Sequence, residues 1–176
     1  GGGRKRTRGK EPGMSQTRPR EWGLVAAAAA LFADQVSKFG LLYGAGFLHM
    51  APGQSIPVLP FFNLIMVWNP GVSYGLFPAS SVWGTALLVL VALAAVAGLG
   101  YWLWGMTSLS LGIGVGMVIG GALGNLIDRL VYGRVADFFH FYGFGYDWYV
   151  FNVADIAITF GAIAIIYEVL KPQPEA

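Results

Sequence analysis

Eight charged side chains stand in the otherwise apolar stretch 22–167, and they are the residues best able to do chemistry. They are Asp34, Lys38, Asp128, Arg129, Arg134, Asp137, Asp147 and Asp155. A charge in an apolar or membrane environment costs several kcal/mol, about 3 kcal/mol on insertion scales, unless it is paired or used. We therefore expect each of the eight side chains to have an oppositely charged partner or a functional role.

Pairing accounts for part of this set. Asp34 and Lys38 are spaced i, i+4 and share a helix face. Asp128 has two nearby cations, Arg129 and Arg134, either of which would neutralise it. Structural ion pairs and a direct role in a site both explain these residues, and the spacing leaves the two interpretations open.

Two carboxylates remain after this matching, Asp137 and Asp155, with too few cations left for them. Two carboxyl groups held close together share a proton, because like charges cannot both ionise easily. The ionised member then activates water while the protonated member polarises a carbonyl. The residues therefore favour an acid–base dyad at Asp137 and Asp155.

Other chemistries fit less well. His49 and His140 are the only histidines, and neither has the His/Glu spacing of a zinc site, so we expect no metal ion and no cofactor. Cysteine is absent, which excludes disulfides and thiol nucleophiles. Ser37 and Lys38 are adjacent and point about 100° apart on a helix, so they cannot form a nucleophile–base pair.

Two asparagines accompany the carboxylates. Asn125 precedes Asp128 by three residues and Asn152 precedes Asp155 by three, so each amide shares a helix face with a carboxyl group. Buried amides hold carboxylates or a substrate backbone by hydrogen bonds. Capping of a helix end is the alternative, and it suits Asn152 especially well.

Composition identifies the environment that must position these residues. Of 176 residues, 56% are apolar or aromatic and 11% are charged, and the mean hydropathy is +0.60. A disordered chain is excluded and an ordinary soluble domain is disfavoured. Four stretches are long enough to cross a bilayer, which needs about 20 helical residues: 23–43, 82–104, 109–128 and 150–170.

The N-terminal arm orients these spans. Residues 1–21 hold nine of the twenty charges, seven of them Lys or Arg, and a basic arm before an apolar segment is typical of a cytoplasmic flank. A phosphate-binding arm for nucleic acid is the weaker interpretation. The first apolar stretch is too long for a signal peptide, although 28–30 would satisfy a cleavage rule. We set residues 1–13 aside as remnants of a tag or of processing.

The prediction is thus an all-α membrane protein with four transmembrane helices, both termini in the cytoplasm, and a small extracytoplasmic β element. Residues 22–170 would form one domain, followed by a tail at 171–176. The stretches 44–81 and 129–149 would face outward, with short strands in 54–68 and a platform or lid in 138–149. All eight charges then fall near the outer surface, and Arg129 and Arg134 lie there against the positive-inside rule, which suggests that they serve a site.

Glycines and aromatic residues complete the pattern. The third span carries glycines at a four-residue repeat, which predicts close helix packing rather than phosphate binding: Gly112, Gly116, Gly120 and Gly124, with Gly121 beside them. Aromatic side chains flank the spans and are interpreted as interface anchors: Trp83, Trp102, Trp104, Trp148 and Tyr149.

Five segments in order resemble the motifs of bacterial lipoprotein signal peptidase, also called signal peptidase II. They are Asp34-Gln35-Val36-Ser37-Lys38, Asn69-Pro70-Gly71-Val72-Ser73-Tyr74-Gly75, Gly120-Gly121-Ala122-Leu123-Gly124-Asn125-Leu126-Ile127-Asp128-Arg129, Val135-Ala136-Asp137-Phe138 and Phe151-Asn152-Val153-Ala154-Asp155. Five motifs in order over residues 22–170 are very specific. One departure is 72–74, where the family commonly has small residues followed by Phe or Trp; this difference concerns the shape of a pocket.

The resemblance implies an aspartic endopeptidase of the bacterial cytoplasmic (inner) membrane. Such an enzyme removes the signal peptide of a diacylglyceryl-modified prolipoprotein just before the lipidated cysteine, at the periplasmic or outer face, without metal. It implies Asp137 and Asp155 as the catalytic pair. It also implies substrate-binding or supporting roles for Asp34, Lys38, Asn69, Gly71, Asn125, Asp128, Arg129 and Asn152. The implied partners are prolipoprotein, membrane lipid and cyclic peptide inhibitors such as globomycin, and not nucleic acid.

Two other classes remain as alternatives. A small proton-coupled transporter would use Asp34, Asp128 and Asp155 as a relay. Its charges cluster at one surface, and the inverted repeats and broken helices of a midplane site are not evident. A non-catalytic membrane scaffold would explain the glycine repeat but not the two unmatched carboxylates.

Overall fold

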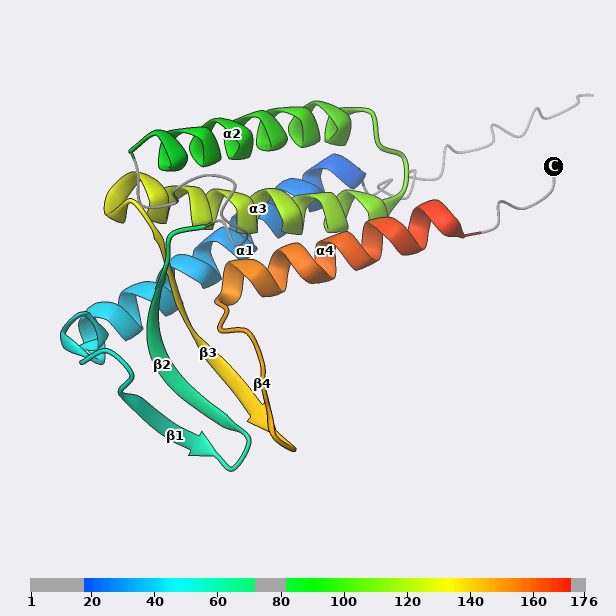
Figure 1. Ribbon diagram of the computed structural model, residues 1–176. Helices are drawn as coiled ribbons and strands as arrows, with labels where there is room; N and C mark the ends of the chain where they lie inside the picture. Colours follow the sequence, from blue (N-terminus) through cyan, green and yellow to red (C-terminus); the bar gives the residue numbers. More distant parts are fainter. Residues whose placement is uncertain (1–17, 72–81, 172–176) are drawn as a thin grey trace, which may run out of the picture.

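The computed structural model describes residues 18–71 and 82–171. The expectations for the basic arm up to residue 17, for the departure at 72–74 and for the last five residues lie outside the described part. Four long helices and one small sheet make up the fold (Figure 1). The helices are α1 (Pro19–Phe39), α2 (Val82–Trp104), α3 (Leu109–Tyr132) and α4 (Val153–Leu170).

All four helices are long and apolar enough to cross a membrane, α1 together with the π-helical segment Gly40–Gly44 that extends it. The four predicted spans are confirmed as helices, with changed boundaries: α1 begins at Pro19 rather than residue 23, and α4 begins at Val153 rather than residue 150. The third continues to Tyr132, beyond the predicted end at residue 128. The charges at 128 and 129 mark no helix end, because Asp128 is buried and paired with Lys38 of α1; the helix ends at Tyr132 and is capped by Gly133 in the left-handed conformation with φ 73°.

Helix α3 is the centre of the bundle, with α1, α2 and α4 around it (Figure 1). Its repeated glycines 112, 116, 120 and 124 face α1, as predicted, and a Cβ at Gly120 would collide with the carbonyl oxygen of Ala27. Gly121 faces the other way, where a Cβ would lie 2.5 Å from the carbonyl oxygen of Ala154 on α4. Glycine thus allows two helices to approach α3 at backbone distance.

Helix α2 is more loosely held. Only Gly84 and Leu103 are buried in it; Val96 and Leu99 are partly buried, and most of its other apolar side chains are exposed, as suits a helix that faces lipid. Leu103 joins the buried cluster of Ala27, Val115 and Ile119 between the helices.

The sheet has four antiparallel strands in the order β1, β2, β3, β4. They are β1 (Ser55–Leu59), β2 (Phe62–Asn69), β3 (Val135–Gly143) and β4 (Tyr146–Asp147). The predicted strands in 54–68 are confirmed. The 138–149 segment is not the expected loop, because most of it forms β3 and β4: the aromatic run 138–142 pairs along β2, with Phe62 opposite Phe141 and Asn69 opposite Val135. A turn with positive φ at Phe144 and Gly145 joins β3 to β4.

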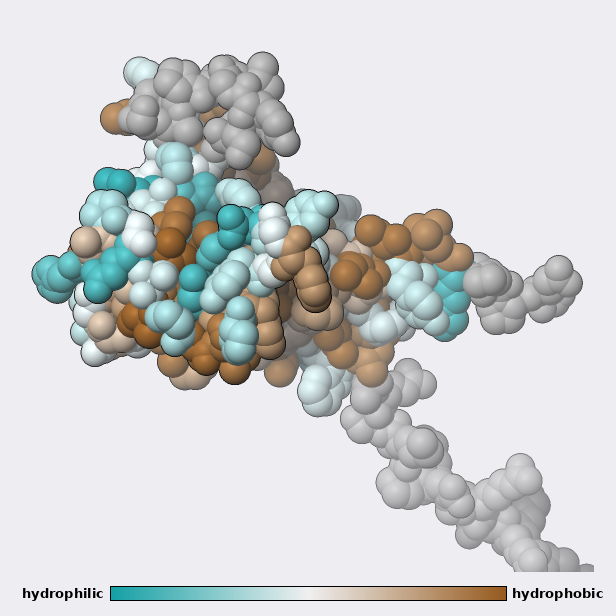
Figure 2. All heavy atoms as spheres, turned by 60° about the horizontal axis from the view of Figure 1, so that its bottom comes forward, coloured by the Kyte–Doolittle hydropathy of each residue, from teal (hydrophilic) through white to brown (hydrophobic). Residues whose placement is uncertain are grey.

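The sheet leaves the bundle at the end where α1 and α3 finish and α2 and α4 begin (Figure 1). Ala136 and Phe138 of β3 bury themselves against Leu42 and Phe47, which follow α1. In Figure 2, hydrophilic residues gather over the sheet end of the molecule, whereas α4 is mainly hydrophobic as it runs away from it. The fold therefore concentrates its polar groups where the sheet meets the helices.

Candidate active site

Lys38 holds two carboxylates at the sheet end of α1. Its Nζ atom lies 2.9 Å from Asp34 Oδ2, 2.8 Å from Asp128 Oδ2 and 3.2 Å from Asn125 Oδ1. An ammonium group has three hydrogens, so all of its donors are used. We call Asp34, Lys38 and Asp128 the ion cluster; all three are buried. The i, i+4 pair is confirmed, but Asp128 pairs with Lys38 and with neither predicted arginine, because α1 lies close enough to α3 for the lysine to cross.

The ion cluster also fixes backbone. Asp34 Oδ1 accepts a hydrogen bond from Ala154 N of α4 at 2.9 Å, and Asp128 Oδ2 accepts one from Ala136 N of β3 at 3.0 Å. Bonds from backbone N–H to a charged acceptor are among the stronger hydrogen bonds in proteins. The cluster therefore connects α1 to α4 and α3 to β3, the two elements that carry the remaining carboxylates.

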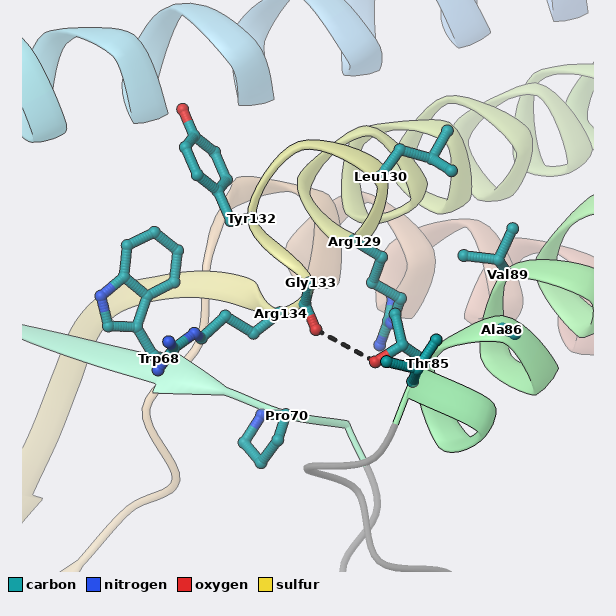
Figure 3. Close-up of a pocket in the computed structure, with 11 residues that line it drawn as sticks. Trp68, Pro70, Thr85, Ala86, Val89, Arg129, Leu130, Tyr132, Gly133 and Arg134 are labelled. Atoms are coloured by element: carbon teal, nitrogen blue, oxygen red, sulfur yellow. Dashed lines mark hydrogen bonds between the residues drawn. The ribbon is translucent and has the colours of Figure 1, made fainter.

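The two arginines lie beside a cavity of about 780 Å³ between α2 and α3 (Figure 3). Arg129 Nη1 donates to Asn125 O at 3.2 Å, while its buried Nε has no hydrogen-bond partner among the described residues. Gly71, with φ 89°, packs on this guanidinium, and a Cβ there would lie 3.0 Å from Nη2. Arg134 stacks over Trp68, 5.4 Å from the ring centroid.

Asp137 is almost wholly covered, with 1% of its surface exposed. Alternation along β3 places it on the face opposite Ala136 and Phe138. Asn152 Nδ2 donates to its Oδ1 at 2.7 Å and Asn69 Nδ2 to its Oδ2 at 3.0 Å. Burial, together with the nearby charge of Asp155, raises the pKa of Asp137 to about 7, although the two amides favour its ionised form.

Asp155 belongs to the first turn of α4. Its backbone N donates to Asn152 Oδ1 at 3.0 Å, and its own Oδ2 accepts from Asn152 N at 3.2 Å, a reciprocal capping box. Asn125 Nδ2 donates to its Oδ1 at 2.9 Å. Unlike Asp137, Asp155 is partly exposed and lines a cavity of about 470 Å³.

A short strand contact fixes the start of α4, which carries Asp155, beside β3, which carries Asp137. Phe151 N donates to Phe139 O, and Phe151 O accepts from the N–H groups of Phe138 and Phe139 at 3.1 and 2.9 Å. Phe151, the residue before the cap of α4, is thereby hydrogen-bonded to β3. Asn152 consequently touches Asp137 with its side chain and Asp155 with its backbone; we call Asp137 and Asp155 the carboxylate pair.

Both interpretations of the asparagines hold at Asn152, which caps α4 and also contacts Asp137. Asn125 connects the two groups of acids, since its Oδ1 receives Lys38 and its Nδ2 donates to Asp155. The structure thus gathers all ten residues named from the sequence at one end of the bundle. The backbone donors Ala136 and Ala154 were missed, since a side-chain pattern carries no signal for them.

Tyr149 was also missed as a site residue. Its hydroxyl lies 3.2 Å from Asn69 Nδ2, although the sequence pointed only to an aromatic anchor. His140 lies on the sheet, with its ring nitrogens 3.0 Å from Asn63 Oδ1 and 3.5 Å from Asp147 Oδ1. Within residues 18–71 and 82–171, no group of three or more His, Cys, Asp or Glu is arranged to hold a metal ion.

Four membrane-length helices define a multi-pass membrane protein, with two carboxyl groups, one buried and one partly exposed, near its sheet end. Residues 26–171 match the family model described as signal peptidase (SPase) II, Peptidase_A8. The lipoprotein signal peptidase of Nitrobacter hamburgensis is 43% identical over 162 residues, 90% of this chain and 97% of that protein. That of Methylobacterium radiotolerans is 47% identical over 151 residues, 86% of each chain.

A solved bacterial membrane enzyme has the same fold, with a TM-score of 0.73 and 30% identity over 86% of this chain and 94% of that one. A second such structure has a TM-score of 0.72 and 28% identity. The chain belongs to the signal peptidase II family, the lipoprotein signal peptidases, which are membrane-embedded aspartic peptidases.

Proposed function

We propose that this chain cleaves diacylglyceryl-modified prolipoproteins just before the lipidated cysteine, by water activation on the carboxylate pair. The observation that carries the proposal is the unequal pair itself. Asp137 is covered and its pKa is raised to about 7, while Asp155 is partly open to a cavity. Such inequality assigns the proton to one carboxyl group and the charge to the other.

In the proposed reaction, Asp155 is the base and Asp137 the acid. Ionised Asp155 takes a proton from water as the water oxygen attacks the scissile carbonyl carbon, and Asp137 gives its proton to the carbonyl oxygen. The tetrahedral intermediate then collapses. The C–N bond breaks, a proton passes from Asp155 to the departing amine nitrogen, and Asp137 recovers its proton as the carboxylic acid forms.

The surrounding residues have supporting tasks in this proposal. Asn69, Asn125 and Asn152 hold the carboxylate pair, while the ion cluster fixes the elements that carry it. Arg129 and Gly71 line the approach from the α2 side, where a peptide carbonyl or a lipid oxygen would meet a guanidinium. Globomycin and related cyclic peptides would occupy the same approach and block cleavage.

The positive-inside argument supports an orientation with both termini in the cytoplasm and the sheet end toward the periplasmic face of the inner membrane. A lipidated substrate lies in the bilayer with its scissile bond near the outer surface. Water reaches that surface directly. Residues 22–170 would act as one peptidase unit in this arrangement.

The test uses the purified protein in detergent with a prolipoprotein in two forms, diacylglyceryl-modified and unmodified, each with and without a chelator. We expect cleavage of the modified form only, at the same rate with chelator, and inhibition by globomycin. Cleavage that stops on chelation would contradict the dyad. Proton flux in liposomes without any peptide cleavage would favour the transporter instead.

A further inference from the structure

Tyr149 follows β4 and reaches back toward the carboxylate pair. The residue is 63% exposed, yet its hydroxyl lies 3.2 Å from Asn69 Nδ2, the same atom that donates to Asp137. A side chain that served only as an interface anchor would have no need of this contact. The hydrogen bond therefore indicates a role for the hydroxyl beyond anchoring.

The hydrogen bonds of Asn69 determine what the hydroxyl can do. Asn69 Oδ1 accepts from Gly71 N at 2.8 Å, which orients the amide so that Nδ2 faces Asp137 at 3.0 Å and Tyr149 at 3.2 Å. An amide nitrogen carries two hydrogens, and these two contacts use both. Tyr149 is thus the acceptor, and its own hydrogen remains to be donated. In the part of the chain that the structure describes, no acceptor lies within hydrogen-bond reach of it.

The hydroxyl hydrogen of Tyr149 is available to a ligand in the cavity of about 470 Å³ beside the carboxylate pair. Asn69, Tyr149 and Asp155 line it together with apolar side chains that include Trp148, Phe151 and Phe160. Tyr149 therefore adds a hydrogen-bond donor to a mainly apolar cavity that also opens onto a carboxylate. A peptide main chain bound there needs donors for its carbonyl oxygens, because an unpaired buried carbonyl is costly.

We propose that Tyr149 is a substrate-binding residue whose hydroxyl, held by Asn69, donates a hydrogen bond to a main-chain carbonyl oxygen of the peptide bound beside Asp155. This inference rests on the proposed function, since it assigns that site a peptide. No covalent step passes through the tyrosine. Its task is to place the peptide so that the scissile bond meets the carboxylate pair.

The experiment compares Tyr149→Phe with the unchanged protein, using the diacylglyceryl-modified prolipoprotein in detergent. The substitution keeps the ring, and with it any anchoring in the membrane interface, and removes only the hydroxyl. Tyr146→Phe is the matched control, because Tyr146 is also exposed and lies three residues away on β4. Steady-state kcat and KM are measured from pH 5 to 9, with thermal unfolding of each variant.

We expect kcat/KM of Tyr149→Phe to fall about tenfold, the effect of one lost hydrogen bond. Tyr146→Phe should stay within about twofold, and the position of the pH profile should not move in either variant. Unchanged kcat/KM in Tyr149→Phe would overturn the inference.

A shifted alkaline limb would overturn it too, since the hydroxyl would then act through Asn69 on Asp137 rather than on the peptide. Absence of cleavage by the unchanged protein would be a different result, because it would contradict the proposed function itself.

Discussion

The ion cluster and the carboxylate pair are joined through Asn125, yet they hold their acids in opposite ways. In the ion cluster two buried carboxylates face one lysine at 2.8 and 2.9 Å. In the carboxylate pair the described hydrogen-bond donors are amides: Asn69 and Asn152 to Asp137, and Asn125 and Asn152 to Asp155.

The difference shows how one fold treats acids that share a cation and acids that do not. A neighbouring cation offsets part of the cost of burying a carboxylate. A neutral amide supports a carboxylate less strongly and leaves burial and the second acid to raise its pKa. The ion cluster therefore suits structure, whereas the carboxylate pair suits chemistry.

The largest effect is expected from Asp137→Asn and Asp155→Asn, each measured as the rate of cleavage of lipidated substrate. Either change removes a proton donor or acceptor and should lower the rate about 1,000-fold or more. Circular dichroism should show that both variants fold. Asp147→Asn is the control, since that acid is exposed on β4, and it should keep its activity. Turnover near the original rate in either pair variant would contradict the mechanism.

Replacement of Lys38 should mainly lower the stability of the protein, because the lysine belongs to the ion cluster and not to the carboxylate pair. Lys38→Met leaves Asp34 and Asp128 buried without their cation, which typically costs about 3–5 kcal/mol. The measurement is the thermal midpoint in detergent, with Lys171→Met, after the end of α4, as the control that should not shift. A variant that is fully stable but inactive would place the ion cluster in the reaction, together with the carboxylate pair.

A smaller loss of stability is expected where α1 meets α3. A Cβ at Gly124 would collide with the Asp34 carboxylate, so Gly124→Ala must push the ion cluster apart. Overpacking of this kind costs about 1–3 kcal/mol, again read from the thermal midpoint. Gly100→Ala in α2 is the matched control, because a Cβ there meets nothing within 4 Å. Equal behaviour of the two variants would show that the close approach is not needed.

The smallest effect concerns pH. If Asp137 must hold the proton, kcat/KM should decline as the pH rises through about 7. Asn69→Ala removes a hydrogen bond that favours ionised Asp137, so its pKa should rise and the alkaline limb should move to higher pH. Asn63→Ala, on the same strand but bonded to His140, should leave the limb in place. A shift of the alkaline limb of Asn69→Ala to lower pH would contradict this prediction.

The same titration has a consequence for stability. The pKa of Asp137 is higher in the folded protein than the ordinary value of 3.8, so the folded state binds the proton more tightly between pH 4 and 7. Its contribution is therefore most favourable at low pH and is lost as the pH rises through about 7. Asp137→Asn should melt with a smaller decline between pH 5 and 8 than the unchanged protein.

Much of the fold could be predicted because membrane spans leave long signals in a sequence. The four helices and the glycine repeat followed from hydropathy and spacing alone. Strand β3 did not, because its long partner β2 ends 66 residues earlier, at Asn69, and its partner nearby in sequence, β4, has only two residues. The pairing of Lys38 with Asp128 was missed for the same reason, since it depends on how closely α1 approaches α3.

For the site, charge matching isolated Asp137 and Asp155 but could not describe how they differ. The difference arises from Phe151, which pairs with β3 by backbone bonds, and from Asn152, which then reaches both acids. The backbone pairing of Phe151 leaves no side-chain pattern, and the spacing of Asn152 indicated its contact with Asp155 but not the one with Asp137. The role of the tyrosine hydroxyl was hidden as well, because an aromatic residue near a span is interpreted first as an anchor.

The capping box of α4 links folding and chemistry in a single residue. Asp155 accepts a hydrogen bond from the free backbone N–H of Asn152 at the start of a membrane-spanning helix, and it also faces the cavity. A substitution there must therefore satisfy both the capping of the helix and the chemistry of the site. A selection for well-folded variants that never measured cleavage should still retain Asp155 or accept only Asn, whose side-chain oxygen can take the same bond from Asn152. Asp137 caps nothing, but its side chain is buried against Asn69 and Asn152, so that selection should accept there only side chains of similar size, such as Asn.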